Sequence, residues 1–284
     1  MTGSSSAQGR FSWYELMTTD VAAAAAFYTE VIGWGAQDAS VPGTPYTLLA
    51  VGEATVAGLM SLPEGARRAG ATPRWVGYVS VDDIDAAAEG IAQRGGMVHV
   101  PPTEMPDISR IAIVADPQTA MFGLITWLDA DDERPSKTDA AGRGGWHELL
   151  AADAKSAFPF YAELFGWQKA ETDFDQLGTY QVFAIDKQAI GGMFTKPPMV
   201  PVPFWLFYFN VDDIDAAAAR TKAAGGEVLE GPVDVKGGAW VIRCVDPQGA
   251  MFALRGPRGK KISGYFERTA SRDPSNAQDR RWSW

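Results

Sequence analysis

The sequence has little that would point to a secreted or membrane-bound protein. Among 284 residues there is a single cysteine, Cys244, which cannot form an internal disulfide and is typical of a small buried side chain in an apolar strand. The first residues lack the charged start and apolar stretch of a signal peptide, and no window reaches the roughly 20 apolar residues of a membrane span. We therefore expect a cytoplasmic protein.

Positive charge is also scarce. Lysine and arginine number 25 against 35 acidic residues, which gives a formal net charge of -10. A chain this acidic is repelled by phosphate backbones and by anionic lipids, so we expect neither a nucleic-acid partner nor a membrane partner. Apolar residues make up 46% of the chain, an ordinary globular proportion that leaves material for two cores.

Three sequence motifs occur twice, in the same order. FYTEVIGW at 27–34 returns as FYAELFGW at 160–167, VDDIDAAA at 81–88 returns unchanged at 211–218, and ADPQTAMFGL at 115–124 returns as VDPQGAMFAL at 245–254. The repeat predicts two homologous domains. The expected organisation is a flexible N-terminus (1–9), domain 1 (10–128), a polar linker (129–142), domain 2 (143–256) and a basic C-terminal extension (257–284).

Each half contains a further, weaker repeat of a strand that ends in aspartate and leads into a helix. The four aspartates are Asp20, Asp83, Asp153 and Asp213, and aspartate is a favoured helix N-cap because its carboxylate accepts hydrogen bonds from free backbone N–H groups. Runs rich in β-branched and aromatic residues follow each helix. The predicted fold is α+β, with two βαβββ modules in each domain forming a curved mixed sheet around a concave pocket.

These features resemble the vicinal-oxygen-chelate superfamily of glyoxalases, bleomycin-resistance proteins and extradiol dioxygenases. The shared features are the paired modules, the FY-containing helix that ends in GW, and the final strand that begins with DP. The likeness covers about residues 11 to 255 and is greatest to tandem bacterial proteins described as glyoxalase-like or hydroxylase-like. It implies tandem glyoxalase-like domains that bind a small molecule.

The resemblance also indicates where a divalent ion would bind. Metal-dependent members use a histidine seven residues before the capping aspartate and a carboxylate on the last strand. The histidine positions hold Trp13, Val76, Trp146 and Leu206, and the carboxylate positions hold Gly123 and Ala253. None of these side chains can ligate a metal ion. We therefore predict no metal cofactor, unless relocated ligands such as Glu15, Glu148 or His147 provide a different site.

The chain has only two histidines. His99 follows a Gly-Gly helix stop, where a role at the edge of a strand is expected. His147 follows Trp146, so strand alternation turns its side chain away from the pocket and toward the helices. We expect His147 to be a hydrogen-bonded core residue, although a slip of one residue in the register would reverse this orientation.

Strand alternation also predicts which side chains line the concave faces. The expected ligand-binding residues are Trp13, Met17, Val76 and Met121 in domain 1, and Trp146, Leu206, Asn210, Met251 and Arg255 in domain 2. This mixture of aromatic and apolar groups suits a small aromatic or amphipathic ligand.

One glutamate and one tyrosine recur on each concave face, as Glu15 with Tyr78 and as Glu148 with Tyr208. A carboxylate enclosed by tryptophan and apolar strands would be desolvated, which raises its pKa toward that of a general base. The tyrosine could donate a hydrogen bond to a developing oxyanion. These pairs are the candidate acid–base residues, while the alternative is that each glutamate simply bonds its neighbours inside a filled core.

The C-terminal extension carries seven basic residues against three acidic ones, together with several aromatic side chains. It is either a solvated tail or a segment that docks on the acidic body or on a second copy of the chain, which would make a homo-oligomer.

Three functions remain open from the sequence. The first is metal-independent binding of a small metabolite, as in drug-sequestering relatives. The second is a metal-independent isomerase, lyase or hydrolase that uses the Glu–Tyr pairs. The third is a metal-dependent lyase or dioxygenase with relocated ligands. A purely structural role would be favoured if both pockets were filled by their own side chains.

Overall fold

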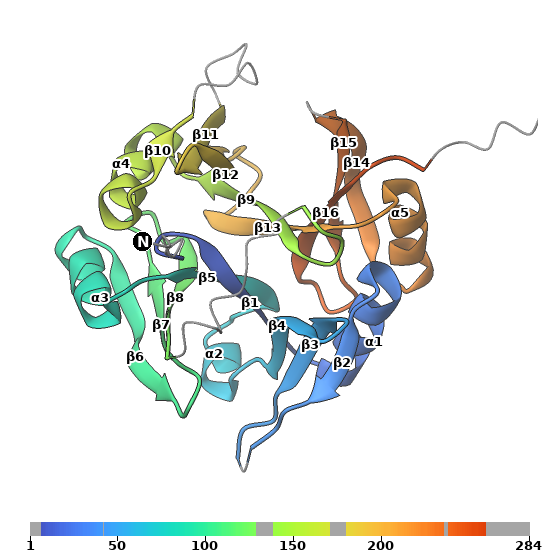
Figure 1. Ribbon diagram of the computed structural model, residues 1–284, viewed down its shortest axis with the longest axis horizontal. Helices are drawn as coiled ribbons and strands as arrows, with labels where there is room; N and C mark the ends of the chain where they lie inside the picture. Colours follow the sequence, from blue (N-terminus) through green and yellow to red (C-terminus); the bar gives the residue numbers. More distant parts are fainter. Residues whose placement is uncertain (1–6, 42, 129–138, 171–179, 236–237, 260–284) are drawn as a thin grey trace, which may run out of the picture.

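The computed structural model describes residues 7–41, 43–128, 139–170, 180–235 and 238–259. Its elements form two halves with the same order (Figure 1). The first half comprises β1 (Phe11–Thr18), α1 (Val21–Ile32), β2 (Gly35–Asp38), β3 (Thr47–Val51), β4 (Ala54–Ser61), α2 (Glu64–Arg68), β5 (Arg74–Ser80), α3 (Ile84–Gln93), β6 (Met97–Met105), β7 (Ser109–Ala115) and β8 (Met121–Trp127). The second half comprises β9 (Gly144–Ala151), α4 (Ala154–Phe165), β10 (Gln168–Lys169), β11 (Tyr180–Ile185), β12 (Gln188–Thr195), β13 (Phe204–Asn210), α5 (Ile214–Ala223), β14 (Glu227–Val235), β15 (Ala239–Val245) and β16 (Met251–Gly256).

Each half forms one mixed eight-stranded sheet. The strand orders are β2-β3-β4-β1-β5-β8-β7-β6 and β10-β11-β12-β9-β13-β16-β15-β14, so the two sheets have the same topology. The first strand of each module lies parallel to its last strand, and the two modules join through an antiparallel pair, β1 with β5 and β9 with β13. The predicted α+β fold of tandem domains, each with two βαβββ modules, is confirmed.

The four helices that open the modules begin where the sequence predicts. The carboxylates of Asp20, Asp83, Asp153 and Asp213 each accept a backbone N–H of the first helical turn. Helices α1 and α4 end at glycines in the left-handed conformation, Gly33 with φ 89° and Gly166 with φ 70°. Only glycine adopts this conformation without strain, which explains the glycine in both GW motifs.

The largest apolar cluster contains residues of both halves, so the two domains share a core and do not each have a separate one. It includes Phe27 and Trp75 of the first half and Phe207 and Phe209 of the second. Helix α1 contacts α5, and α3 contacts α4, while β5 contacts β13 between them (Figure 1). The helix-bearing faces of the two sheets therefore pack against each other, and the concave faces point outward.

Equivalent hydrogen bonds cross this interface in both directions. The Tyr28 hydroxyl donates to Asp246 at 3.0 Å, and the Tyr161 hydroxyl donates to Asp116 at 2.9 Å. Each aspartate also accepts backbone N–H groups of its own DPQ turn. In the same reciprocal manner, Trp34 donates to the Gly142 carbonyl and Trp167 donates to the Gly9 carbonyl. The FY and GW motifs thus join the domains as well as packing helix onto sheet.

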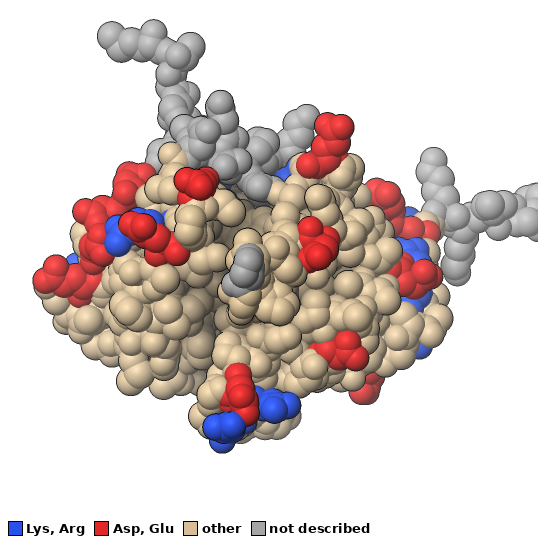
Figure 2. All heavy atoms as spheres, turned by 90° about the horizontal axis from the view of Figure 1, so that it is seen from below, with Lys and Arg blue, Asp and Glu red and all other residues tan. Residues whose placement is uncertain are grey.

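The chain ends make further contacts. Residues 257–259 lie against α5, where Arg258 pairs with Asp215 and stacks over the Trp240 ring. The rest of the C-terminal extension, and residues 129–138 of the linker, fall outside the described residues. Figure 2 shows one face on which acidic groups are scattered and the few basic groups lie next to acidic ones. None of the helices in the described ranges has the length and apolarity needed to cross a bilayer.

Candidate functional site

Both concave faces bring together most of the side chains that strand alternation predicts. In domain 1, Trp13, Val76 and Tyr78 form an apolar cluster with Ile113 and Ile125, and Met17 and Met121 pack against it. In domain 2, Leu206 and Tyr208 form the matching cluster with Leu150 and Ala253, flanked by Trp146 and Met251. The predicted orientation of the first and central strands is therefore the observed one.

Each face has a glutamate at its centre. In domain 1, Tyr78 donates to Glu15 Oε2 at 2.8 Å and Tyr46 donates to Glu15 Oε1 at 2.9 Å. Only 7% of Glu15 is exposed. Burial raises the pKa of the Glu15 carboxyl, and the two tyrosine hydrogen bonds oppose this shift. Domain 1 thus holds a desolvated carboxyl that has hydroxyl partners and no cation beside it among the described contacts.

Domain 2 repeats this arrangement and adds a cation. Tyr208 donates to Glu148 Oε2 at 2.8 Å, and Tyr180 accepts a hydrogen bond from Trp146 at 2.9 Å. Arg243 binds the same Glu148 oxygen at 2.8 Å and also contacts Glu230 at 2.5 Å. The guanidinium therefore stabilises the charge of a glutamate that is only 4% exposed.

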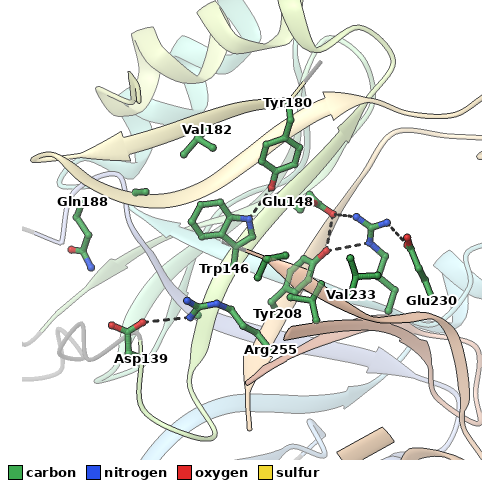
Figure 3. A pocket seen from close by; sticks show the side chains of 15 residues that line it. Asp139, Trp146, Glu148, Tyr180, Val182, Gln188, Tyr208, Glu230, Val233 and Arg255 are labelled. Carbon is green, nitrogen blue, oxygen red and sulfur yellow. Dashed lines mark hydrogen bonds and ion pairs between the residues drawn. The ribbon is translucent and has the colours of Figure 1, made fainter. Parts of the chain in front are cut away.

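A cavity of about 590 Å³ opens on the concave face of domain 2 (Figure 3). Its lining includes the aromatic residues Trp146, Tyr180 and Tyr208 and the aliphatic residues Val182, Ala189, Val233, Val235 and Val241. The polar side chains at the cavity are Asp139, Glu148, Gln188, Glu230, Arg243 and Arg255. An apolar volume of this size with a few convergent polar groups is typical of a small-molecule site.

Four of the predicted residues of domain 2 line this cavity: Trp146, Glu148, Tyr208 and Arg255. Leu206 and Met251 lie in the apolar cluster of the same face and do not line the cavity. Asn210 is buried and donates to the Ala140 carbonyl at 3.3 Å, so it holds the chain that enters β9. Asn210 was predicted to lie on the pocket wall, but it is not among the residues that line the cavity.

Both histidines are located as expected. His99 is exposed on the edge strand β6. His147 is buried between domains, with Nδ1 2.6 Å from the Ile190 carbonyl and Nε2 2.6 Å from the Tyr14 hydroxyl. Since a carbonyl can only accept, Nδ1 carries the proton and Nε2 accepts from Tyr14. Burial lowers the pKa of His147 to about 4, which keeps the ring neutral.

The residues at the positions implied for a divalent ion do not fit one. The Tyr78 ring packs so closely on Gly123 that a Cβ there would lie 2.2 Å from it, and Ala253 pairs with Tyr208 in the same register. Across the described part of the chain, no three histidine, cysteine, aspartate or glutamate side chains gather in a way that could hold a metal ion. In the cavity, Glu148 and Glu230 are joined by Arg243 instead.

Besides several residues of the cavity rim and wall, sequence reasoning missed three side chains that surround the central glutamates: Tyr46, Tyr180 and Arg243. Tyr46 and Tyr180 are equivalent in the duplication, since each lies twelve positions before the glycine that pairs with the central glutamate, Gly58 or Gly192. That repetition is a signal in the sequence. Arg243 was also detectable, as the one charged residue within the apolar run WVIRCV.

Comparison with known proteins gives the chain a family context. The profile described as the glyoxalase/bleomycin resistance protein/dioxygenase superfamily matches residues 10–123 and again residues 145–254. A protein of Mycobacterium tuberculosis, CFP32, described as a candidate glyoxylase, is 35% identical over 253 residues, or 88% of this chain and 95% of that protein. The anthracycline biosynthesis protein DauV of Streptomyces sp. strain C5 is 31% identical over 260 residues, or 87% and 93% of the two chains.

Solved structures share the fold at low sequence identity. The Mn(II)-bound glyoxalase from Novosphingobium aromaticivorans superimposes with a TM-score of 0.60 at 15% identity, covering 89% of this chain and 83% of that one. A variant of homoprotocatechuate 2,3-dioxygenase from B. fuscum gives a TM-score of 0.58 at 14% identity, covering 88% and 71%. These similarities establish the architecture of paired modules.

Proposed function

Because the chain belongs to the glyoxalase/bleomycin resistance protein/dioxygenase superfamily, we propose that it binds a small aromatic or amphipathic metabolite in the domain 2 cavity without a metal ion. The observation that carries this proposal is the lining of the cavity. Aromatic and aliphatic walls surround an ion pair, Glu148 with Arg243, at the place where the superfamily resemblance implies a metal. Aromatic walls supply contact area for a flat ligand, and a few fixed polar groups orient it.

Glu148 and Arg243 are held in place before a ligand arrives. Glu148 is bound by Tyr208 and Arg243, and Arg243 also donates to the Tyr208 hydroxyl at 3.2 Å. A preorganised network of this kind lowers the entropic cost of binding. The name of the Streptomyces relative DauV, which refers to anthracycline biosynthesis, supports a flat polycyclic aromatic as the class of ligand.

The experiment has two parts, made on protein purified without a tag or chelator. Elemental analysis should give far less than one transition-metal ion per chain. Isothermal titration with a flat polycyclic acid such as anthraquinone-2-carboxylate should then give saturable binding, which Trp146→Ala weakens about tenfold or more through loss of a stacking surface. Trp240→Ala is the matched control, because Trp240 does not line the cavity. A stoichiometric metal ion would favour the metal-dependent alternative with relocated ligands.

A second candidate function is that of a metal-independent enzyme. The surroundings of Glu15 favour it. The raised pKa of Glu15 and its two tyrosine donors, Tyr46 and Tyr78, resemble an acid–base pair that could move a proton. Mass spectrometry of the ligand after incubation would test this candidate. Conversion that disappears in Glu15→Gln would establish catalysis, while recovery of unchanged ligand would leave a binding protein. Glu148→Gln tests Glu148 and Tyr208 in the same way.

A further inference from the structure

The duplication provides an internal comparison of two concave faces built on the same strands. The glutamate, both tyrosines and the tryptophan are common to both faces, as Glu15, Tyr46, Tyr78 and Trp13 and as Glu148, Tyr180, Tyr208 and Trp146. Common ancestry is enough to explain these shared residues. The residues that differ between the faces therefore carry more information about what each face recognises.

Two of the differences at matched positions place a positive charge on the domain 2 face. Ile113 pairs with Gly123 in domain 1, and Arg243 pairs with Ala253 at the same place in domain 2. Ile125 pairs with Ile111, and its counterpart Arg255 pairs with Val241. The isoleucines of domain 1 show that the fold forms with apolar side chains at both of these positions. Placing two guanidinium groups there costs desolvation, which the fold itself does not require.

The two arginines differ in how far their donors are satisfied. Arg243 binds Glu148, Glu230 and the Tyr208 hydroxyl, so it is fixed within the wall. Among the described residues, Arg255 has one ion pair, a long contact of 3.5 Å to Asp139, whose side chain is 89% exposed. An ion pair with a solvated carboxylate contributes little, and a guanidinium has five N–H donors. Arg255 and Trp146 both line the cavity (Figure 3).

We propose that the ligand of the domain 2 cavity is an acidic aromatic, whose carboxylate or phenolate is bound by Arg255 while its ring stacks on Trp146. This inference rests on the proposed binding function and names the ligand class of the same cavity. The planar guanidinium matches a carboxylate in a bidentate geometry, and an arriving anion replaces the screened contact with Asp139. Arg243 stays with Glu148 and keeps that buried acid from repelling the ligand.

Acidic side chains also lie at the cavity rim, so the alternative to be tested is that the cavity prefers a cationic ligand. Asp139 and Glu230 are exposed by 89% and 54%, so an aromatic cation could bind between them. Because these two acids are so exposed, solvent screens their attraction for a cation. The attraction of Arg255 for an anion is screened less, since only 30% of Arg255 is exposed. A ligand carboxylate that reaches Arg255 lies in the less solvated part of the cavity, where a charge-assisted hydrogen bond is stronger.

Three probes of one shape separate these cases: 2-naphthoate, neutral 2-naphthamide and cationic 2-naphthylmethylammonium, titrated calorimetrically into the full chain. We expect 2-naphthoate to bind about 10- to 100-fold more tightly than the amide, the range for a hydrogen bond to a charged group. In Arg255→Gln this preference should disappear while the affinity for the amide is retained. Arg110→Gln is the control, because Arg110 pairs with Asp85 on the other domain.

Each result has a distinct meaning. Equal binding of 2-naphthoate and 2-naphthamide, or tightest binding of the ammonium, would overturn the acidic-ligand inference and leave aromatic binding intact. Failure of all three probes, and of anthraquinone-2-carboxylate, would contradict the proposed function itself. If Arg255→Gln does not fold, the charge preference of the unmodified protein and its weakening at higher salt still decide the question, since the attraction of an anion to Arg255 is screened.

Discussion

Glu15 and Glu148 are equivalent by duplication but have different electrostatic surroundings. Glu148 neutralises Arg243, of which 29% is exposed, whereas tyrosine hydroxyls bind both oxygens of Glu15. Removing one member of a buried ion pair leaves the other charge without compensation. The two glutamates should therefore contribute differently to stability.

We expect Glu148→Gln to lower the free energy of unfolding by about 1–3 kcal/mol, below the full cost of breaking a buried pair because Arg243 keeps Glu230 and partial exposure. Glu15→Gln should cost less than about 1 kcal/mol, since a glutamine oxygen can still accept from tyrosine. Denaturant titration of both variants measures the difference. Equal losses would show that the ion pair has no special role in stability.

His147 gives the protein a predictable sensitivity to acid. Its pKa is about 4 in the folded protein, below the ordinary value of 6.5, so the unfolded chain binds more protons between these values. Stability contributed by the neutral ring is thus present above pH 6.5 and is lost as the pH falls toward 4. The full effect is on the order of 3 kcal/mol.

Replacing His147 with glutamine, which does not titrate, should flatten this dependence. The difference in unfolding free energy between the unmodified protein and His147→Gln should change steadily between about pH 6.5 and about pH 4. The buried carboxyls, whose pKa values are raised, act in the opposite direction in both proteins and cancel in this comparison. A constant difference across that range would contradict a neutral buried histidine.

Helices α1 and α4 join the domains through one tyrosine each. In α1, the Tyr28 hydroxyl accepts from Trp75 at 2.8 Å and donates to Asp246, so its loss leaves two buried partners unsatisfied. We expect Tyr28→Phe to lower the free energy of unfolding by about 1–3 kcal/mol. Tyr161→Phe should behave in the same way, because Tyr161 has the equivalent contacts with Trp205 and Asp116. Thermal unfolding of each variant tests this, and an unchanged melting temperature would contradict it.

The sequence predicts elements best where local chemistry determines them. Aspartate caps, glycine stops and alternating strands locate the four main helices and the central strands, and the repeat gives the pairing of modules. The edge strands are less apparent, because β2 and β10 are wholly exposed and have no apolar alternation. The short helix α2, likewise with no buried residue, has no amphipathic pattern to reveal it.

Contacts that depend on the packing of one domain on the other could not be predicted from local pattern. The repeat shows that two similar units exist, but it does not show that their helix-bearing faces meet and share a core. For this reason the roles of Tyr28 and Asp246 in joining the domains emerge only from the structure. The same limit applies to Asn210, which strand alternation turns toward the pocket and which instead binds the chain that enters domain 2.

The shared core makes the two domains one cooperative unit. Separating them would expose the rings of Phe27, Trp75, Phe207 and Phe209 to water at considerable cost. We therefore expect calorimetry of the full chain to show one unfolding transition whose calorimetric and van't Hoff enthalpies agree. Two resolved transitions would mean that each domain has an independent core.

The molecule thus presents two outward concave faces on a shared core, and only the domain 2 face, among the described residues, has an arginine in contact with its central glutamate. The central claim is that this face binds an aromatic ligand with protein side chains alone. The direct test is calorimetric titration of chelator-treated protein with 2-naphthoate or anthraquinone-2-carboxylate, repeated after adding manganese, iron, nickel or zinc. The account predicts the same affinity in every case. Binding that requires an added metal ion would contradict it.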